Sequence, residues 1–385
     1  MLSGLEKLKK DSFKSLRDAR VAILANQSSV DIDFKHIIDI AISHGIKVTK
    51  IFAPEHGFFG SLQDMEHVGS NIHHRYKVPV VSLYGDHKDS LRLRSSELKD
   101  VDILLCDLQD IGSRYYTFHC TISWAMAAVA ECKKKLMVVD RPNPISCVFE
   151  GNLVKNSQFS FVGAYPLPNR HGFTMGEIAN YVKELYQPDL DLEVIWMENY
   201  KRDLFIDELG TPFVPTSPNM PTLNTALVYP GMCLLEGTNL SEGRGTTTPF
   251  ELFGAPFLNI DKFKDELESN DLEGVKFRTM NFRPMFHKHA SKNCGGIFIH
   301  VTDRKVFKPL RLGLSVIRAA IKIDGFDWRR EPYEYETNRL AIDLLLGDPE
   351  LRLMLEGQAN IGEIFSKISE EENEFSKIRR KFLHY

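Results

Sequence analysis

The 385-residue sequence lacks an excess of charge of either sign, a paired set of cysteines and a long apolar run. With 48 basic and 52 acidic side chains the formal net charge is −4, so nothing favours nucleic acid or an anionic membrane surface as a partner. The six cysteines are scattered without a C-x-x-C pair, which favours small buried core residues. No segment approaches the ~18 apolar residues of a membrane span. The first residues also lack an apolar core of signal-peptide length, so we expect a cytoplasmic protein without a membrane partner.

Several cofactor and catalytic motifs are also missing. There is no G-x-G-x-x-G after the first predicted strand and no G-x-x-x-x-G-K-[ST], so no nucleotide cofactor is expected. There is no G-x-S-x-G and no H-E-x-x-H. The histidines lack the spacing of metal ligands, so no metal is expected. A metal-dependent hydrolase that uses His56, His87 and His171 stays open as an alternative.

The first part of the chain alternates strand-like and helix-like segments. Apolar, β-branched segments predict strands, and apolar residues at helical spacing predict helices at 34–44 and 118–132. This alternation predicts an α/β fold with a doubly wound parallel sheet, and the chain length favours two domains. The five predicted strands are 20–25, 48–53, 78–84, 101–106 and 136–139.

Polar or ionisable side chains directly follow each of these five strands. Because the carboxyl ends of parallel strands share one edge of a sheet, where such folds bind ligands, we expect these clusters to converge. A polar turn after one strand is ordinary, whereas five in succession indicate a site. The clusters are Asn26/Gln27, Glu55/His56, Asp86/His87, Asp107/Asp110/Arg114 and Asp140/Arg141/Asn143.

The pattern changes from Glu150 onward. Thr174-Met-Gly-Glu177 is a capping box and predicts a helix to about Tyr186. The apolar segment 226–235 predicts a short strand broken at Pro230-Gly231. Two irregular polar stretches, 215–222 and 236–250, flank it. Further strands are predicted at 192–197 and 295–301 and helices at 310–323 and 361–383, the last with a charged surface face.

The residues at the predicted sheet edge suit a polyhydroxylated substrate. Glycoside hydrolysis needs one carboxylic acid to protonate the leaving oxygen and a second group on the other face of the sugar. Glu55 lies beside His56 and the apolar Phe58-Phe59, and partial desolvation raises the proton affinity of a carboxylate. Candidates for the second group are Asp107, Asp110, Glu236 and Glu242.

The segment Glu242-Gly-Arg-Gly-Thr-Thr-Thr248 is the most specific local pattern. Glycine permits close approach of the backbone to a ligand, and turns of this kind expose N–H groups to anions. Arg244 between the two glycines is therefore expected to grip a carboxylate. A purely structural glycine-rich turn is the alternative.

Longer motifs along the chain resemble those of the NamZ-type exo-β-N-acetylmuramidases, also described as YbbC-like proteins. The matches follow one another in order from Val21 to about Phe257, and the last third of the chain follows the family pattern more loosely. They are Ala53-Pro-Glu-His-Gly-Phe58, Asp107-Leu-Gln-Asp-Ile-Gly-Ser-Arg-Tyr-Tyr-Thr117, Asp140-Arg-Pro-Asn-Pro144, Arg170-His-Gly172, Ser217-Pro-Asn-Met-Pro-Thr222, Tyr229-Pro-Gly231, Glu236-Gly-Thr-Asn-Leu-Ser-Glu-Gly-Arg-Gly-Thr246 and Pro249-Phe-Glu-Leu252.

The resemblance implies a Rossmann-like domain in residues 1–150, a smaller α/β domain in residues 151–385 and an active site in the cleft between them. It also implies release of N-acetylmuramic acid from the non-reducing ends of peptidoglycan fragments. The expected partner is therefore a small-molecule substrate, a muropeptide or a MurNAc-GlcNAc fragment. A non-catalytic muropeptide-binding protein with the same cleft is the alternative, and the oligomeric state stays open.

Carried over onto the matching motifs, Glu55 is the expected catalytic acid, with His56 adjusting its proton affinity. Asp107, Asp110 and Glu236 compete for the second role, or the 2-acetamido group of the substrate attacks while a carboxylate orients it. The expected substrate-binding residues are Asn26, Arg114, Tyr115, Tyr116, Asp140, Arg141, Asn143, Arg170, His171, Asn219, Thr238, Ser241, Glu242, Arg244 and Thr246.

Overall fold

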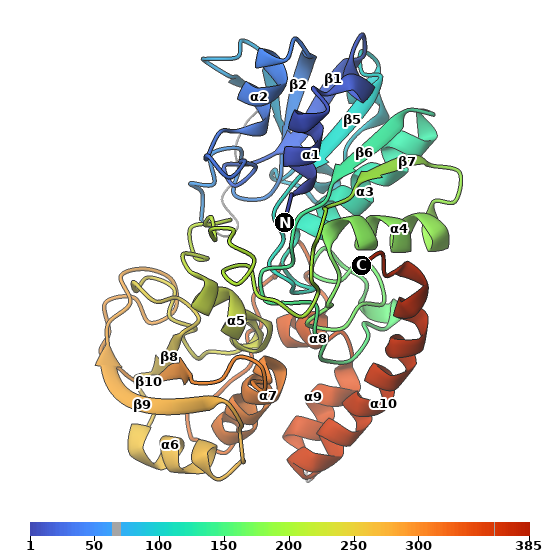
Figure 1. Cartoon of the computed structure of the whole chain (residues 1–385). Coiled ribbons are helices and arrows are strands. Elements are labelled where there is room, and N and C mark those ends of the chain that lie inside the picture. The colour runs from blue at the N-terminus through green and yellow to red at the C-terminus, as the bar shows by residue number, and fades with distance from the viewer. Residues whose placement is uncertain (64–70, 358) are drawn as a thin grey trace.

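The computed structural model describes residues 1–63, 71–357 and 359–385 (Figure 1). The first half is built on a seven-stranded sheet in which every strand except the short edge strand β3 runs parallel to its neighbours. All five strands predicted in the first 150 residues are present within a few residues of their expected bounds, which confirms the α/β fold. Across the sheet the order is β3 (Asn71–Ile72), β4 (Pro79–Ser82), β2 (Lys47–Ala53), β1 (Arg20–Ala25), β5 (Ile103–Asp107), β6 (Lys135–Val139) and β7 (Asp191–Ile195).

Helices cover both faces of this sheet, as a doubly wound fold requires. Alternate residues of β1 face opposite layers: Val21 and Ile23 pack with α1 (Gly4–Lys10) and α2 (Ile37–Ser43), whereas Ala22 and Leu24 pack with the layer of α3 (Phe118–Glu131) and α4 (Met175–Tyr186). The strand order reverses between β1 and β5, and ligands of such sheets bind at this point, outside the carboxyl ends of the strands.

The sheet extends beyond residue 150, where the first domain was expected to end. β7 pairs in parallel with β6 along its whole length, from Asp191 to Ile195. The crossover between β6 and β7 contains α4. The first turn of α4 has the capping box predicted from Thr174 and Glu177. The segment from residue 151 to β7 is therefore part of the first sheet and its covering layer.

The second half of the chain is a smaller α/β unit. Its sheet has three antiparallel strands in the order β8 (Leu252–Ala255), β10 (Cys294–Val301) and β9 (Val275–Phe282). No helix among the described residues is long and apolar enough to cross a bilayer. The helices of this unit are α5 (Leu223–Met232), α6 (Ile260–Glu268), α7 (Pro309–Ala320), α8 (Ala341–Leu346), α9 (Pro349–Glu356) and α10 (Ile361–Arg379). Short 3-10 turns occur at Lys14–Leu16, Lys88–Leu91, Ser95–Leu98, Asn156–Gln158, Cys233–Gly237 and Arg380–Phe382.

The strand predicted at 226–235 is wrong, because most of this segment is the helix α5. Thr222 caps the helix by accepting a hydrogen bond from the backbone N–H of Thr225. Every residue from Thr225 to Met232 is buried, so the segment shows no polar face from which a helical period can be read. Gly231 lies against the backbone of Pro309 and Gly313 in α7, too close for any side chain. Close helix packing therefore explains this glycine, which was read as a strand break.

Arg114 joins the two halves of the chain at a fully buried position. Its Nη1 donates to the carbonyls of Asn152 and Leu167 at 2.8 Å each, and its Nη2 donates to those of Leu345 at 2.7 Å and Leu346 at 2.9 Å. Burial lowers the pKa of the guanidinium to about 10. Its four carbonyl partners show that Arg114 cross-links the fold.

The last helix of the chain also returns to the first half (Figure 1). On α10, the ring of Phe375 packs against Phe149 and Phe173, with centroids 5.5 and 5.6 Å away. The guanidinium of Arg379 lies 4.5 Å from the ring centre of Phe149 and donates to the carbonyl of Gly172. The charged face predicted for this helix is present, and its apolar face covers residues of the first domain.

The site of Asp140 predicts a measurable pH dependence of stability. Asp140 follows β6 and accepts hydrogen bonds from Thr174 at 3.0 Å, from the N–H of Gly176 at 2.8 Å and from the hydroxyl of Tyr385. Burial, helped by the nearby Glu177, raises the pKa of this carboxyl to about 7. An unfolded carboxyl has a pKa of ~3.9, so between about pH 4 and pH 7 the folded state binds the additional proton.

The free energy of unfolding should therefore decrease as the pH rises from about 4 to about 7, and this contribution should be constant above pH 7. In Asp140→Asn the contribution disappears. We expect urea unfolding at pH 4.5 and pH 7.5 to show a loss of stability, on the order of a few kcal/mol, that is larger in the native sequence than in the variant. Equal losses in both proteins would contradict the assignment to Asp140.

Candidate active site

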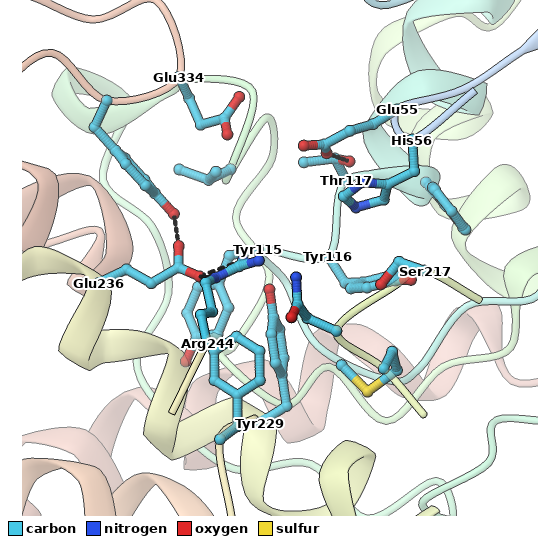
Figure 2. Close-up of a pocket in the computed structure, with 16 residues that line it drawn as sticks. Glu55, His56, Tyr115, Tyr116, Thr117, Ser217, Tyr229, Glu236, Arg244 and Glu334 are labelled. Carbon is cyan, nitrogen blue, oxygen red and sulfur yellow. Dashed lines mark hydrogen bonds and ion pairs between the residues drawn. The ribbon is translucent and has the colours of Figure 1, made fainter. Parts of the chain in front are cut away.

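One pocket lies between the two halves of the chain, at the carboxyl end of β2 (Figure 2). Its empty volume is about 470 Å³, part of it open to solvent. The first half contributes Glu55, His56, Tyr115, Tyr116, Thr117, Phe118 and Val162, and the segments after residue 215 contribute Ser217, Asn219, Met220, Tyr229, Glu236, Arg244, Phe250, Tyr333 and Glu334. The cleft expected between two domains is therefore present.

Glu55 and His56 enter the pocket through the turn that ends β2. Pro54 stops the strand, and His56 then adopts a left-handed backbone with φ of 67°. A left-handed conformation is uncommon for residues other than glycine and costs of order 1–3 kcal/mol, which is typical of functional sites. The hydroxyl of Thr117, at the start of α3, donates to Oε2 of Glu55 at 2.6 Å. This bond orients a carboxylate that is only 6% exposed.

The tautomer of His56 follows from its hydrogen bond. Nδ1 lies 2.9 Å from the carbonyl oxygen of Leu62, and because a carbonyl only accepts, Nδ1 carries the hydrogen. In the neutral ring Nε2 is then the acceptor. His56 thus brings a potential proton acceptor next to the carboxylate of Glu55.

Glu236 and Arg244 form an ion pair on the opposite wall of the pocket (Figure 2). Nη2 of Arg244 lies 2.7 Å from Oε1 of Glu236, and the hydroxyl of Tyr333 donates to Oε2 of Glu236 at 2.7 Å. The guanidinium also lies 5.2 Å from the ring centre of Phe250. Both oxygens of Glu236 thus have partners, and its position suits it to hold Arg244 in place.

Glu242 supports the same wall from outside the pocket. Burial alone would raise the pKa of its carboxyl, but the charges of Lys288 at 2.9 Å, His287 at 3.2 Å and Arg244 at 3.6 Å hold it well below its usual range. The backbone turn predicted around Gly243 and Gly245 is present, and both glycines have positive φ. Glu242 therefore serves the turn that presents Arg244.

Asp107 and Arg141 also lie outside the pocket. They form a bidentate ion pair in which Nη2 of Arg141 lies 2.7 Å from Oδ2 of Asp107 and Nε bonds Oδ1. The side chain of Asp107 is fully buried, and that of Arg141 is 8% exposed. The pair sits at the switch point between β1 and β5, and the two carboxylate oxygens are both used by the guanidinium. Asp107 is thus a structural anion in this structure.

Asp110 and His171 form a second buried pair. The backbone N–H of Phe173 donates to Nδ1 of His171, so Nε2 carries the hydrogen and donates to Oδ2 of Asp110 at 2.9 Å. The same oxygen accepts from the N–H of Gly112 at 2.6 Å. This pair joins two loops that follow β5 and β6, and it does not line the pocket.

The twenty site residues predicted from the sequence divide into two groups. Seven of the twenty line the pocket: Glu55, His56, Tyr115, Tyr116, Asn219, Glu236 and Arg244. The other expected ligands use their hydrogen bonds within the fold, because loops at the strand ends must satisfy their own backbone groups. These are Asn26, Asn143, Arg170, Thr238, Ser241 and Thr246, with bonds to Thr216, Phe173, Ile145, Leu235, Gly243 and Gly243 respectively, together with Arg114, Asp140, Glu242 and the two pairs above.

Sequence reasoning missed several residues of the pocket, above all Glu334. This carboxylate is 3% exposed and accepts a hydrogen bond from the hydroxyl of Tyr84 at 3.1 Å. Its loop, Tyr333-Glu-Tyr-Glu336, has no helical or strand period, and its alternating aromatic and acidic residues were the only available signal. Thr117, Ser217, Tyr229 and Tyr333 were missed as well, although Thr117, Ser217 and Tyr229 lie within or at the end of recognised motifs.

The described residues contain no group of three or more histidine, cysteine, aspartate or glutamate side chains arranged to hold a metal ion. His56 lines the pocket, whereas His171 is fully buried against Asp110. The three histidines of the metal-hydrolase alternative therefore do not form one site.

A cleft with buried carboxylates on two walls, an arginine, several tyrosines and an amide is the kind of site found in glycoside hydrolases. Comparison with known proteins identifies the family of glycoside hydrolases. The family model for the N-terminal domain of the exo-β-N-acetylmuramidase NamZ matches residues 21–224, and that for its C-terminal domain matches residues 227–385. The chain therefore belongs to the NamZ family of exo-β-N-acetylmuramidases.

Individual relatives agree with this assignment. The chain is 40% identical over 385 residues to the peptidoglycan β-N-acetylmuramidase NamZ of Bacillus subtilis, covering all of this chain and 91% of the relative. Two crystal structures of Bacteroides fragilis proteins of the DUF1343 family superpose with TM-scores of 0.88 and 0.77, each at 28% identity and over 100% of this chain and 98% of the other. The resemblance and the fold expected from the sequence are confirmed.

Proposed function

We propose that the protein hydrolyses the β-glycosidic bond of a terminal N-acetylmuramic acid residue in peptidoglycan fragments. As a member of its family it is a glycoside hydrolase. The observation that carries the proposal to individual atoms is the carboxylate of Glu55, held by Thr117 and flanked by His56 in the pocket. Glu55 protonates the leaving sugar oxygen, the role of the general acid in glycoside hydrolysis.

Arg244 supports the choice of sugar. Among the described residues that line the pocket, Arg244 is the one permanently charged cation. N-acetylmuramic acid differs from N-acetylglucosamine by a lactyl ether that ends in a carboxylate. A guanidinium held by Glu236 and Phe250 presents a fixed donor for this carboxylate. The natural substrate is then a small muropeptide or a MurNAc-GlcNAc fragment met in the cytoplasm.

The direct test compares the nitrophenyl β-glycosides of N-acetylmuramic acid and N-acetylglucosamine with a MurNAc-GlcNAc disaccharide. We expect turnover of both muramic substrates and little of the glucosamine glycoside. Equal turnover of the two nitrophenyl glycosides would show that the enzyme does not recognise the lactyl group. No turnover of any of the three would overturn the proposed activity.

Replacing Arg244 by glutamine should weaken the preference for the lactyl group. A hydrogen bond to a charged group contributes ~1.5–3 kcal/mol, so kcat/KM for the muramic glycoside should fall about 10- to 100-fold. The glucosamine glycoside, which lacks the carboxylate, should lose far less. Arg283→Gln, at an exposed arginine of the second half, is the matched control and should change neither value. A similar fall for both sugars would assign Arg244 to the architecture of the pocket.

A further inference from the structure

The loop that contains Glu334 is tied to both walls of the pocket. The hydroxyl of Tyr335 donates to the carbonyl of Gly85 at 2.6 Å, and the carboxylate of Glu336 pairs with Lys88. On the other side, Tyr333 donates to Glu236 at 2.7 Å. The loop belongs to the second half of the chain, yet three of its residues, Glu334 included, bind the segment after β4 in the first half. These contacts hold Glu334 at one position between the two walls.

The backbone of the loop is strained at the residue that enters the pocket. Glu334 has φ of 47° and Tyr335 has φ of 64°, so two successive non-glycine residues are left-handed. Each such residue costs of order 1–3 kcal/mol and persists only where the surroundings enforce it. The side chain placed in this way is a carboxylate that is 3% exposed, although burial of a carboxylate is itself unfavourable. Strain and burial together indicate a position kept for its chemistry.

The carboxylate of Glu334 faces that of Glu55 across the pocket (Figure 2). Glycoside hydrolysis needs two such groups on opposite sides of the sugar. Neither Asp107 nor Asp110 lines the pocket, and both oxygens of Glu236 have partners in Arg244 and Tyr333. By position Glu334 is thus the best placed of these carboxylates to face Glu55.

We propose that Glu334 is the second catalytic carboxylate of this enzyme, the base that takes a proton from the attacking water; this rests on the proposed glycosidase function. In the step, water oxygen forms a bond to the anomeric carbon while the bond from that carbon to the leaving oxygen breaks. Glu334 accepts the proton that the water loses, and Glu55 gives its proton to the leaving oxygen. Exchange with solvent then restores both carboxyl groups. The hydroxyl of Tyr84 orients Glu334 for this transfer.

Glu334→Gln tests the role, because glutamine keeps an oxygen that accepts the bond from Tyr84 but cannot take a proton. Loss of a general base lowers kcat by about 10²–10⁴-fold. We expect a fall of at least 100-fold with little change in KM, and an equal fall for the disaccharide and the nitrophenyl glycoside, since activation of water does not depend on the leaving group. Glu331→Gln, at an exposed glutamate three residues before Glu334 and outside the pocket, is the control and should stay within about twofold.

Azide provides the second readout. It is already an anion and needs no base, so it should restore turnover of the nitrophenyl glycoside in Glu334→Ala and yield the α-glycosyl azide. A merely structural role would give a variant that azide does not rescue, or a Glu334→Gln enzyme with near-native kcat, and either result overturns the proposal. If the native protein releases no sugar at all, the proposed function itself fails, so the two failures are distinguishable.

Discussion

Glu55→Gln is expected to lower kcat for the MurNAc-GlcNAc disaccharide about 1000-fold, within the 10²–10⁴ range for loss of a general acid. A sugar alkoxide is a poor leaving group, so the bond breaks only as a proton arrives. Glutamine has the size of glutamate and can still accept the hydrogen bond from Thr117, but it has no proton to transfer. The position of the side chain is thus kept while its chemistry is lost.

The nitrophenyl glycoside separates this role from others. Nitrophenolate leaves without protonation, so the same variant should lose much less of its rate on that substrate. Initial rates on both substrates, with KM measured for each, are sufficient. Glu184→Gln, at an exposed glutamate of α4, is the matched control. Equal losses on the two substrates would show that Glu55 does not act as the acid.

Asp107→Asn is expected to cost about 3–5 kcal/mol of unfolding free energy, because breaking a buried ion pair leaves an uncompensated charge. The carboxylate of Asp107 is fully buried against the guanidinium of Arg141. In the variant this guanidinium would remain buried beside a neutral amide. Urea unfolding measures the loss directly. The double variant with Arg141→Met should recover much of it, since a buried pair can often be replaced by apolar groups at little cost.

The chain provides a control with the same geometry at the surface. Arg20 and Asp102 also form a two-bond ion pair, at 3.0 and 2.7 Å, but their side chains are 40% and 41% exposed. Asp102→Asn should therefore change stability far less than Asp107→Asn. Activity per folded molecule should persist in Asp107→Asn. A stable but inactive Asp107→Asn protein would instead return Asp107 to the list of catalytic candidates.

The sheet was predictable from the sequence because its strands are apolar runs whose alternate residues must face two helical layers. Val21 to Ala25 shows this pattern, and the structure places its alternate side chains in two separate cores. The helix α5 was not predictable in the same way. From Thr225 to Met232 it is buried on all sides, so this part of its sequence contains no polar face, and only the close contact of Gly231 with α7 reveals what the glycine does.

The polar strand ends predicted a site at the edge of the sheet where the pocket lies, but they did not distinguish residues that line the pocket from residues that support the fold. Glu55 follows the end of β2 and Asp107 is the last residue of β5, and only the three-dimensional structure shows that Asp107 is paired with Arg141 while Glu55 lines the pocket. Glu334 illustrates the opposite case. It lies in an irregular loop far along the chain, and its position depends on contacts with Tyr84 and Gly85 that no local pattern encodes.

The cross-link made by Arg114 has a consequence for how the molecule comes apart. Its guanidinium bonds carbonyls of residues 152 and 167 as well as 345 and 346, so both family segments supply its hydrogen-bond partners. Removing the second half would leave the buried guanidinium without two of its four carbonyl partners. The first family segment therefore depends on the second for its stability, and melting is expected to proceed as a single cooperative event.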